Sequence, residues 1–395
     1  LLGILAILVF ILVGIIISIY PNWLWFGNLN FAPVFWTMAL GTYGVAAVIW
    51  FLMIVTLSVT LYAAQRFQSE SEQKITEIAG MPVSGKSLNI IILAAIMIVS
   101  FVIASKGSVQ WNMVLSYLNQ HPFGSTDPIF GKDIAFYVFS LPFYLLVREQ
   151  LLIILLFAAL VTVIWYIKEG GVQMIGELVL AEDRPAALPK VKIADKVGKH
   201  LLVLAGIVVL LAAWGYQLKT YGVLYSTQGP AFGASYTDVN IKIIAYRILM
   251  VMSFLFCLFI IYNAFRLKLK PLLICAGIWV GAIVVLATGL PILVQQFMVK
   301  PNELAKESPY IAYNIDFTRR AYNLNRIKEV DFEVNNNLSA QEIKNHDVTI
   351  QNIRVWDERP LLKTYRQIQS IRLYYDFNNV DVDRYLIDNQ YRQVM

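Results

Sequence analysis

Charge, cysteine and histidine are all scarce in this sequence. Only 15% of the 395 residues are Asp, Glu, Lys or Arg, whereas soluble domains carry about 25%. The two cysteines, Cys257 and Cys275, both fall inside apolar runs, which argues against a disulfide framework or a zinc site built from cysteines. The three histidines lie far apart and form no metal-binding pair. These shortages indicate no cofactor.

Long apolar runs are what the sequence has in excess. The chain is 58% hydrophobic and its mean hydropathy is +0.61. The runs are about 18–25 residues long, enough to cross a hydrocarbon core about 30 Å thick. The sequence therefore predicts a mainly α, polytopic membrane protein with seven transmembrane helices. The expected spans are about 1–20, 35–63, 88–104, 143–167, 201–218, 243–265 and 271–294.

Positive charge alternates between the loops that connect these runs. Loops 64–87, 168–200 and 266–270 are basic, whereas the loops between them carry few lysines or arginines. Because basic loops stay in the cytoplasm, we expect the N-terminus inside and everything after about residue 295 outside. Anionic lipid headgroups are the expected partners of the basic loops. They suffice to explain the pI of about 9.1, so we expect no nucleic-acid partner.

The sequence divides into two predicted domains. Residues 1–294 form the transmembrane domain, with short helices on its outer face near 108–120 and 134–141. Residues 295–395 mix helical spacing with alternation of apolar and polar residues, and they read as the start of an extracytoplasmic α/β domain. Helices are expected in 301–324 and 360–375, and strands at 349–357 and 380–388. The chain lacks an initial Met and stops within a polar pattern, so we expect it to be incomplete at both ends.

Turn-forming residues precede the fourth span. Asp127, which a proline follows, and Gly131 predict turns. Asp133 is expected to cap a short aromatic helix at 134–140. A calcium site formed by Asp127 and Asp133 is the alternative interpretation.

The helix after this turn is predicted to be longer than the membrane requires. Pro142 suits the first position of a new helix, where its missing N–H costs nothing. A helix from Pro142 to Ile167 exceeds the roughly 20 residues that span the hydrocarbon core. We therefore expect the apolar side chains of residues 134–146 to be covered by the domain after residue 295.

A few ionisable residues stand out as candidate sites. Arg247 lies about one turn inside the sixth span. It is interpreted as snorkelling to the headgroups, as an ion-pair partner of Glu149, or as a site for an anionic ligand. Asp381 and Asp383 share one face of a predicted strand. This face is interpreted either as solvated or as a contact for a metal ion or a substrate. We find no Ser-His-Asp or Cys-His set and no pair of carboxylates that stands out as an acid and base.

The segment "GMPVSGKS", residues 80–87, satisfies the nucleotide-binding pattern G-x-x-x-x-G-K-[ST] with Gly80, Gly85, Lys86 and Ser87. A true phosphate-binding loop follows a buried strand of a parallel sheet. Here a predicted membrane span follows directly, and the loop is too short to form a sheet. We interpret the match as chance and expect no nucleotide binding.

Five blocks of the sequence resemble a known group of membrane proteins. They are WLWFGNLNFAPVFW (23–36), DPIFGKDIAFYVFSLPFY (127–144), LYSTQGPAFGASYTDVN (224–240), KPNELAKESPYIAYNI (300–315) and the segment 349–395. In this order they resemble the UPF0182 family of bacteria and archaea. The resemblance implies a prokaryotic plasma membrane protein with seven spans and a large extracytoplasmic domain, of which this chain holds only part. The family has no established activity, so the resemblance assigns no site residues.

The favoured function is non-enzymatic. With no catalytic set and few polar groups inside the spans, we expect an envelope scaffold or accessory protein. Its outer domain would dock on the spans and bind a protein partner or a second copy of the chain. A transporter of a lipid-like or small-molecule substrate is the alternative. An extracytoplasmic enzyme is the third, and it would need Asp381, Asp383 and His346 to cluster.

Overall fold

The structure is a computed structural model that describes two compact units. The described residues are 17, 19–67, 77–78, 81–82, 85–175, 190–332, 334, 337–354, 357–369, 374 and 376–394. The first unit comprises Leu1–Tyr322 and the second comprises Asn323–Met395. The first unit thus extends beyond residue 294, the predicted end of the transmembrane domain.

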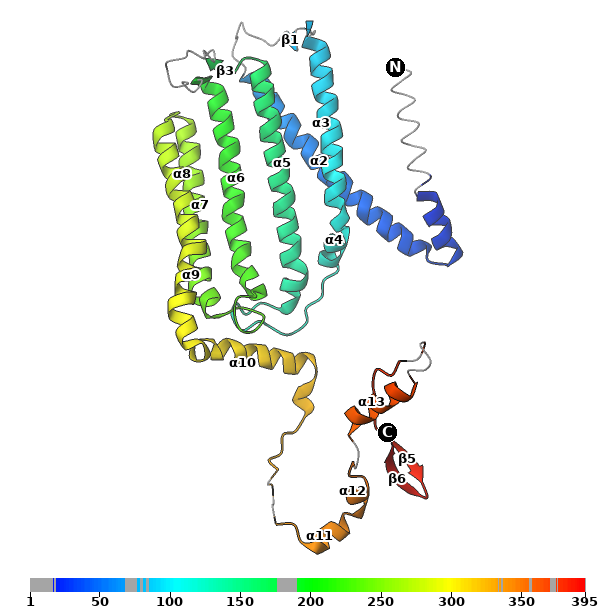
Figure 1. Cartoon of the computed structure of the whole chain (residues 1–395). Helices are drawn as coiled ribbons and strands as arrows, with labels where there is room; N and C mark the ends of the chain where they lie inside the picture. Colours follow the sequence, from blue (N-terminus) through cyan, green and yellow to red (C-terminus); the bar gives the residue numbers. More distant parts are fainter. Residues whose placement is uncertain are drawn as a thin grey trace. The chain divides into compact units, whose positions relative to one another are not determined.

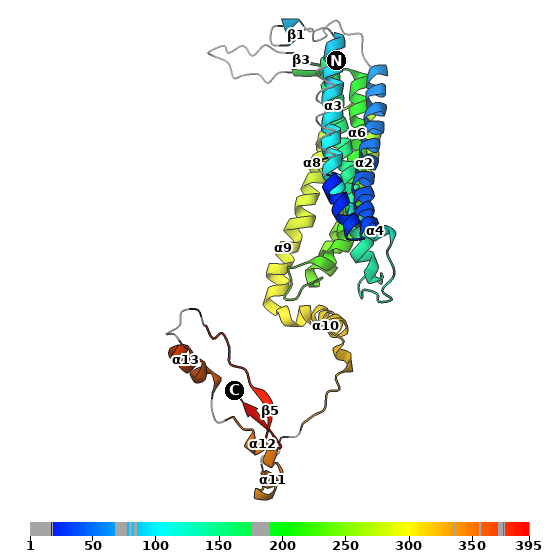
Figure 2. The same cartoon turned by 90° about the vertical axis from the view of Figure 1, so that its right-hand side faces the viewer.

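Long apolar helices make up most of the first unit. Six helical segments among the described residues are long and apolar enough to cross a membrane, and most run side by side as a bundle (Figures 1 and 2). They correspond to the second to seventh predicted spans, whereas the first, 1–20, lies almost wholly outside the described residues. The helices of these segments are α2 (Ala32–Arg66), α3 (Gly85–Gly107), α5 (Leu141–Lys168), α6 (Asp195–Gly222), α7 (Ile243–Ala264), α8 (Leu269–Ile283) and α9 (Leu290–Val294).

Small and hydroxyl side chains bring neighbouring helices together. On α6, a methyl group added to Gly206 would lie 3.4 Å from a side-chain carbon of Ile261 on α7. The Trp279 indole N–H of α8 donates to the Ser253 hydroxyl of α7 at 2.9 Å. Close backbone approach and hydrogen bonds between helices are the usual means of helix association in membranes.

Three wide π-helical turns, distributed over two of the helical segments, each lie shortly before a proline. These turns are Phe136–Ser140 before Pro142, Val284–Gly289 before Pro291 and Gln295–Val299 before Pro301. Inside an α-helix the proline ring clashes with the carbonyl four residues earlier and removes one hydrogen bond. A turn widened by one residue lets the helix continue past the proline.

One prediction about the outer helices is therefore corrected. Pro142 does not begin a new helix, because the helical run is unbroken from Ile134 to Lys168. A helix near 108–120 is found as expected. It comprises a short 3₁₀ turn and α4 (Trp111–Leu118), which continue directly from α3. Trp111 then packs so closely on α2 that a methyl group added to Gly41 would lie 2.5 Å from its ring.

The predicted cover of residues 134–146 is also different. Tyr137 and Leu141 are buried against Leu218, near the end of α6, with Trp214 and Tyr221 beside them. The main cover of these residues is thus α6, and not the domain after residue 295. Of the residues after 295, α10 (Glu303–Ala321) belongs to the first unit. It runs across the end of the bundle at a steep angle to α9 (Figures 1 and 2).

The second unit contains short helices and one hairpin. Its helices are α11 (Ala340–Asn345), α12 (Asp347–Gln351) and α13 (Glu358–Gln369), and β5 (Asp383–Ile387) pairs antiparallel with β6 (Gln390–Val394). The predicted strand at 380–388 and the helix in 360–375 are confirmed in part. The strand expected at 349–357 is wrong, because its first three residues belong to α12.

Two further antiparallel strand pairs are found in the first unit. β1 (Glu77–Ile78) pairs with β2 (Met81–Pro82), and β3 (Val172–Ile175) pairs with β4 (Lys190–Ile193). Throughout the described ranges, each sheet has two strands and none is parallel.

Candidate functional site

Three segments that are distant in the sequence meet at one end of the bundle. They are the loop before α5, the loop between α6 and α7, and α10. Each of them overlaps one of the blocks on which the family resemblance rests. Together they enclose the candidate site.

The first loop is organised around the carboxylate of Asp127, a residue that is only 5% exposed. Its Oδ1 accepts the backbone N–H of Ile129 at 2.9 Å and of Phe130 at 2.6 Å. Its Oδ2 accepts the N–H of Lys132 at 2.8 Å and the Tyr137 hydroxyl at 2.8 Å. The predicted turn is confirmed, since the Gly131 N–H also donates to the Asp127 carbonyl at 3.1 Å.

Asp133 closes the same loop and caps the following helix. It accepts N–H groups from Phe123 at 3.0 Å, Gly124 at 2.9 Å and Ala135 at 2.8 Å. The bond from Ala135 confirms the predicted helix cap. These N–H groups, that of Phe123 first and then those of Ala135 and Gly124, hold the pKa of the Asp133 carboxyl below its ordinary value.

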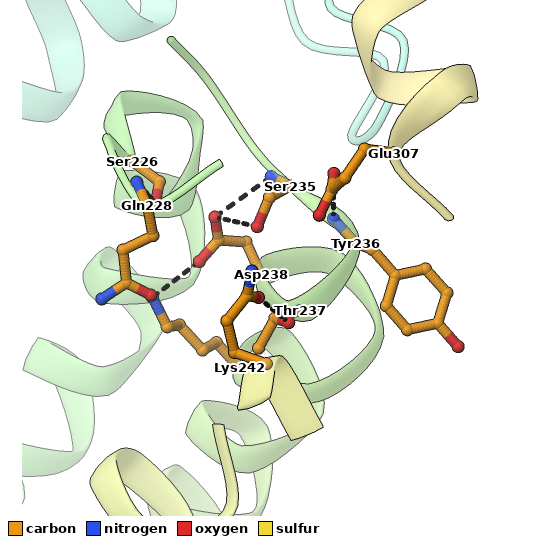
Figure 3. A network of polar contacts seen from close by, with 9 residues as sticks. Ser226, Gln228, Ser235, Tyr236, Thr237, Asp238, Lys242 and Glu307 are labelled. Carbon is orange, nitrogen blue, oxygen red and sulfur yellow. Dashed lines mark hydrogen bonds and ion pairs between the residues drawn. The ribbon is translucent and has the colours of Figure 1, made fainter. Parts of the chain in front are cut away.

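The second loop is held by Asp238, which is fully buried. The backbone N–H and the hydroxyl of Ser235 both donate to its Oδ2, at 3.1 and 2.9 Å (Figure 3). The other oxygen forms an ion pair with Lys242 at 2.7 Å. Lys242 also donates to the Gln228 side chain at 2.7 Å, which links both ends of this loop. A buried carboxylate is stable here because a cation and hydrogen bonds compensate its charge.

Helix α10 is fastened to the second loop by three hydrogen bonds. The Tyr236 N–H donates to Glu307 Oε2 at 3.0 Å (Figure 3). Asn240 donates to the Tyr310 hydroxyl at 2.9 Å, and Asn314 donates to the Phe232 carbonyl at 2.7 Å. These bonds position α10 as the third wall of the site.

The cavity between these walls has a volume of about 370 Å³. Its lining, as far as the described residues show, includes six aromatic side chains and two carboxylic acids, Asp127 and Glu307, but no Lys, Arg or His. The aromatic residues are Tyr137, Tyr225, Phe232, Tyr310, Tyr313 and Phe317. Glu307 is 1% exposed, and its Oε1 has no hydrogen-bond partner among the described residues. The site can therefore accept an apolar molecule that brings a hydrogen-bond donor.

A family comparison identifies the group to which these segments belong. The model of the uncharacterised protein family UPF0182 matches residues 1–395. The chain belongs to the UPF0182 family. The UPF0182 protein of Desulforamulus reducens is 34% identical over 98% of this chain, and that of Trichlorobacter lovleyi is 35% identical over 96%. The Clostridium tetani member is 38% identical over 73% of the chain.

This UPF0182 chain spans less than half the length of these relatives. The alignments cover 42% of the Desulforamulus and Trichlorobacter proteins and 32% of the Clostridium protein. No solved structure matches the chain. The family match and the six apolar helices indicate a bacterial membrane protein.

Arg247 and Glu149, which the sequence suggested as an ion pair, lie outside the cavity. Arg247 and Glu149 are both exposed, and neither lines this cavity. No ion pair joins them in the described part of the chain. The neighbouring Arg148 instead crosses to α6, where its Nε donates to the Leu211 carbonyl at 3.0 Å.

The carboxylates proposed as metal ligands accept hydrogen bonds from groups of the protein. Asp127 and Asp133 each accept several N–H groups, which occupy positions that a cation would need. Asp381 and Asp383 lie in the second unit and are exposed. They accept bonds from Asn379 at 2.8 Å and from the Arg384 N–H at 2.7 Å. Within the described ranges, no three His, Cys, Asp or Glu residues group as metal ligands.

The nucleotide-binding pattern falls partly outside the described residues. Gly80 is not described, whereas Gly85, Lys86 and Ser87 begin α3. The strand pair before them is antiparallel and only two residues long on each side. The local fold thus differs from the parallel sheet that a phosphate-binding loop follows.

Sequence reasoning did not single out Asp238 or Glu307. Both lie in polar stretches that read as solvated loops or helix faces. The available signal was that each falls inside a block carrying the family resemblance, at 224–240 and 300–315. Their burial depends on contacts between segments about 70 residues apart, such as that between Tyr236 and Glu307.

Proposed function

We propose that this protein is a non-enzymatic binding protein of the bacterial cell envelope, and that the cavity receives its ligand. The observation that carries the proposal is the preformed cavity at the end of the bundle, held open by Asp127, Asp238 and α10. Its volume of about 370 Å³ falls in the range of roughly 300–1,000 Å³ typical of small-molecule sites.

The charge pattern supports an outward-facing cavity. Loops 105–142 and 219–242 are poor in positive charge, unlike the loops at the opposite ends of the helices. By the positive-inside rule, the loops that form the cavity face outside. This chain then presents its ligand site to the extracytoplasmic space, with anionic lipids at its basic loops. A protein partner or a second copy of the chain completes this scaffold function.

An enzymatic role has less support in this part of the protein. The proposed enzyme required Asp381, Asp383 and His346 to cluster in a pocket. In the second unit Asp381, Asp383 and His346 are all exposed. The cavity in the first unit holds two acids, but Asp127 is saturated by four donors and is poorly suited to proton transfer.

Native mass spectrometry of the purified full-length protein tests the proposal. We expect a small molecule to remain bound at a fixed stoichiometry. Ala231 lines the cavity, and Ala231→Trp should fill the space and abolish this binding. Ala321 is exposed at the end of α10 and does not line the cavity, so Ala321→Trp is the matched control. Equal occupancy in both variants would contradict the proposal, and uptake of the same molecule into sealed vesicles would favour transport.

A further inference from the structure

The charge of the cavity restricts its ligand more than its size does. Asp127 and Glu307 supply the acidic side chains of the lining, and no basic side chain among the described residues joins them there. An anionic ligand would therefore enter a low-dielectric space without a counter-ion, which is unfavourable. A cation would be attracted instead.

The lysines closest in sequence to the walls are engaged elsewhere. Lys242 is paired with Asp238 at 2.7 Å. The Lys306 ammonium lies 5.0 Å from the centre of the Tyr236 ring. The Lys132 ammonium lies 4.8 Å from the ring centre of Phe136. None of them lines the cavity, so no basic side chain in the described part of the chain neutralises the acidic lining.

Glu307 has an unused acceptor in this lining. One carboxylate oxygen takes the Tyr236 N–H at 3.0 Å, and the other has no partner in the described part of the chain. Buried polar atoms without partners are rare and often mark the place of a ligand, ion or water. Glu307 is 1% exposed, and this burial raises the pKa of its carboxyl. A cation beside the carboxyl would favour its charged form, and little water would screen the pair.

Aromatic rings surround the same space. Tyr310, Tyr313 and Phe317 come from the same helix as Glu307, and Tyr225 and Phe232 come from the second loop. Aromatic faces attract organic cations, and cages of such rings recognise ammonium groups. Rings and a carboxylate together suit a molecule with a positive group on an apolar body.

We propose that the cavity binds an organic ammonium ion, with Glu307 as its counter-ion and the aromatic rings around its apolar body. This inference rests on the proposed function, since it names the ligand class of the same cavity. The ammonium group can belong to a soluble amine or to an aminolipid headgroup, because both present the same chemistry.

Two probes that share a phenylethyl body but carry a charged ammonium or a neutral hydroxyl test the inference. The full-length protein in nanodiscs is titrated with 2-phenylethylammonium and with the neutral 2-phenylethanol. A hydrogen bond to a charged group contributes about 1.5–3 kcal/mol, so we expect the ammonium probe to bind about tenfold or more tightly. Glu307→Gln should reduce this preference to about one, because the amide removes the negative charge. The amide keeps the shape of the side chain and can still accept the hydrogen bond from the Tyr236 N–H. Glu303→Gln removes an exposed carboxylate one turn earlier and should retain the preference.

The outcomes separate this inference from the proposed function. If both probes bind the natural protein equally and Ala231→Trp blocks both, the cavity is a ligand site but the ammonium inference is wrong. An unchanged preference in Glu307→Gln would also overturn it. If neither probe binds and no co-purified molecule depends on Ala231, the proposed function fails as well. The lipid of the nanodisc separates the two sources of the ammonium group. Weaker binding of the ammonium probe in phosphatidylethanolamine than in phosphatidylglycerol nanodiscs would assign the group to a lipid headgroup. Equal binding of the probe in both would assign it to a soluble amine.

Discussion

Replacing Asp127 with alanine would remove the acceptor that organises the first wall of the cavity. Four donors converge on this carboxylate at 2.6–2.9 Å, three of them backbone N–H groups and one the Tyr137 hydroxyl. In Asp127→Ala these donors lose their partner in a site where Asp127 is 5% exposed. We expect the loop before α5 to open.

The cost can be estimated from these contacts. A hydrogen bond to a charged group contributes about 1.5–3 kcal/mol to stability. The loss is smaller where the freed donor can form a hydrogen bond to water instead. Because the loop can turn part of its backbone to solvent, we expect a loss of about 3–5 kcal/mol, below the sum of four separate bonds. Asp127→Asn keeps one oxygen acceptor but points an NH₂ group at the remaining donors. It should lose about 2–3 kcal/mol by the same reasoning.

Hydrogen exchange and thermal unfolding of the detergent-solubilised protein measure these effects. The amides of Ile129, Phe130 and Lys132 should exchange much faster in Asp127→Ala, and the melting temperature should fall in the order natural, Asn, Ala. The matched control is Asp381→Ala, which removes an exposed carboxylate from the second unit. Unchanged protection of the three amides in Asp127→Ala would refute the reasoning.

Three further predictions concern other contacts of the first unit. Lys242→Met leaves the buried Asp238 without its cation and should cost about 3–5 kcal/mol, measured by chemical unfolding. The double variant with Asp238→Asn should recover part of this loss, and equal stability of Lys242→Met and the natural protein would argue against a buried pair. Gly41→Ala places a methyl group 2.5 Å from the rigid Trp111 ring and should cost about 1–3 kcal/mol through overpacking. Gly44→Ala, where nothing lies within 4 Å, should be neutral, so equal melting temperatures of these two variants would contradict the contact. Asp133 stabilises the fold in its charged form because its folded pKa is lowered. Its contribution is therefore fully present above its unfolded pKa of about 3.9 and is lost as the pH falls through the lower folded value. The stability difference between the natural protein and Asp133→Asn should accordingly shrink on acidification from pH 6, and a difference that grows there would exclude this role.

Much of the helical arrangement could be predicted from local sequence. Six of the seven predicted spans coincide with long apolar helices, because membrane-length apolar runs have few other stable conformations. Turn chemistry was equally local, since Asp127, Gly131 and Asp133 act on residues within about ten positions. The expected strand at 349–357 failed because alternation over a few residues also fits a short helix turn such as α12.

Pro142 shows where the rule that proline begins a helix was insufficient. Its missing N–H suggested the start of a helix, yet the helix continues through it from a widened turn. Packing of Tyr137 and Leu141 against α6 stabilises this continuous run. The sequence alone does not reveal that favourable packing, so it could not decide between a new helix and a bulged one.

The sequence by itself determined the class of the protein, its six described apolar helices and the turns around Asp127 and Asp133. These features depend on hydrophobicity and on hydrogen bonds between near neighbours, which the order of residues specifies directly. Only the tertiary structure decided that Asp238 and Glu307 are buried and that three distant segments enclose one cavity. A charged residue in a polar stretch is solvated or buried according to what packs against it, and here that partner arrives from a different part of the chain.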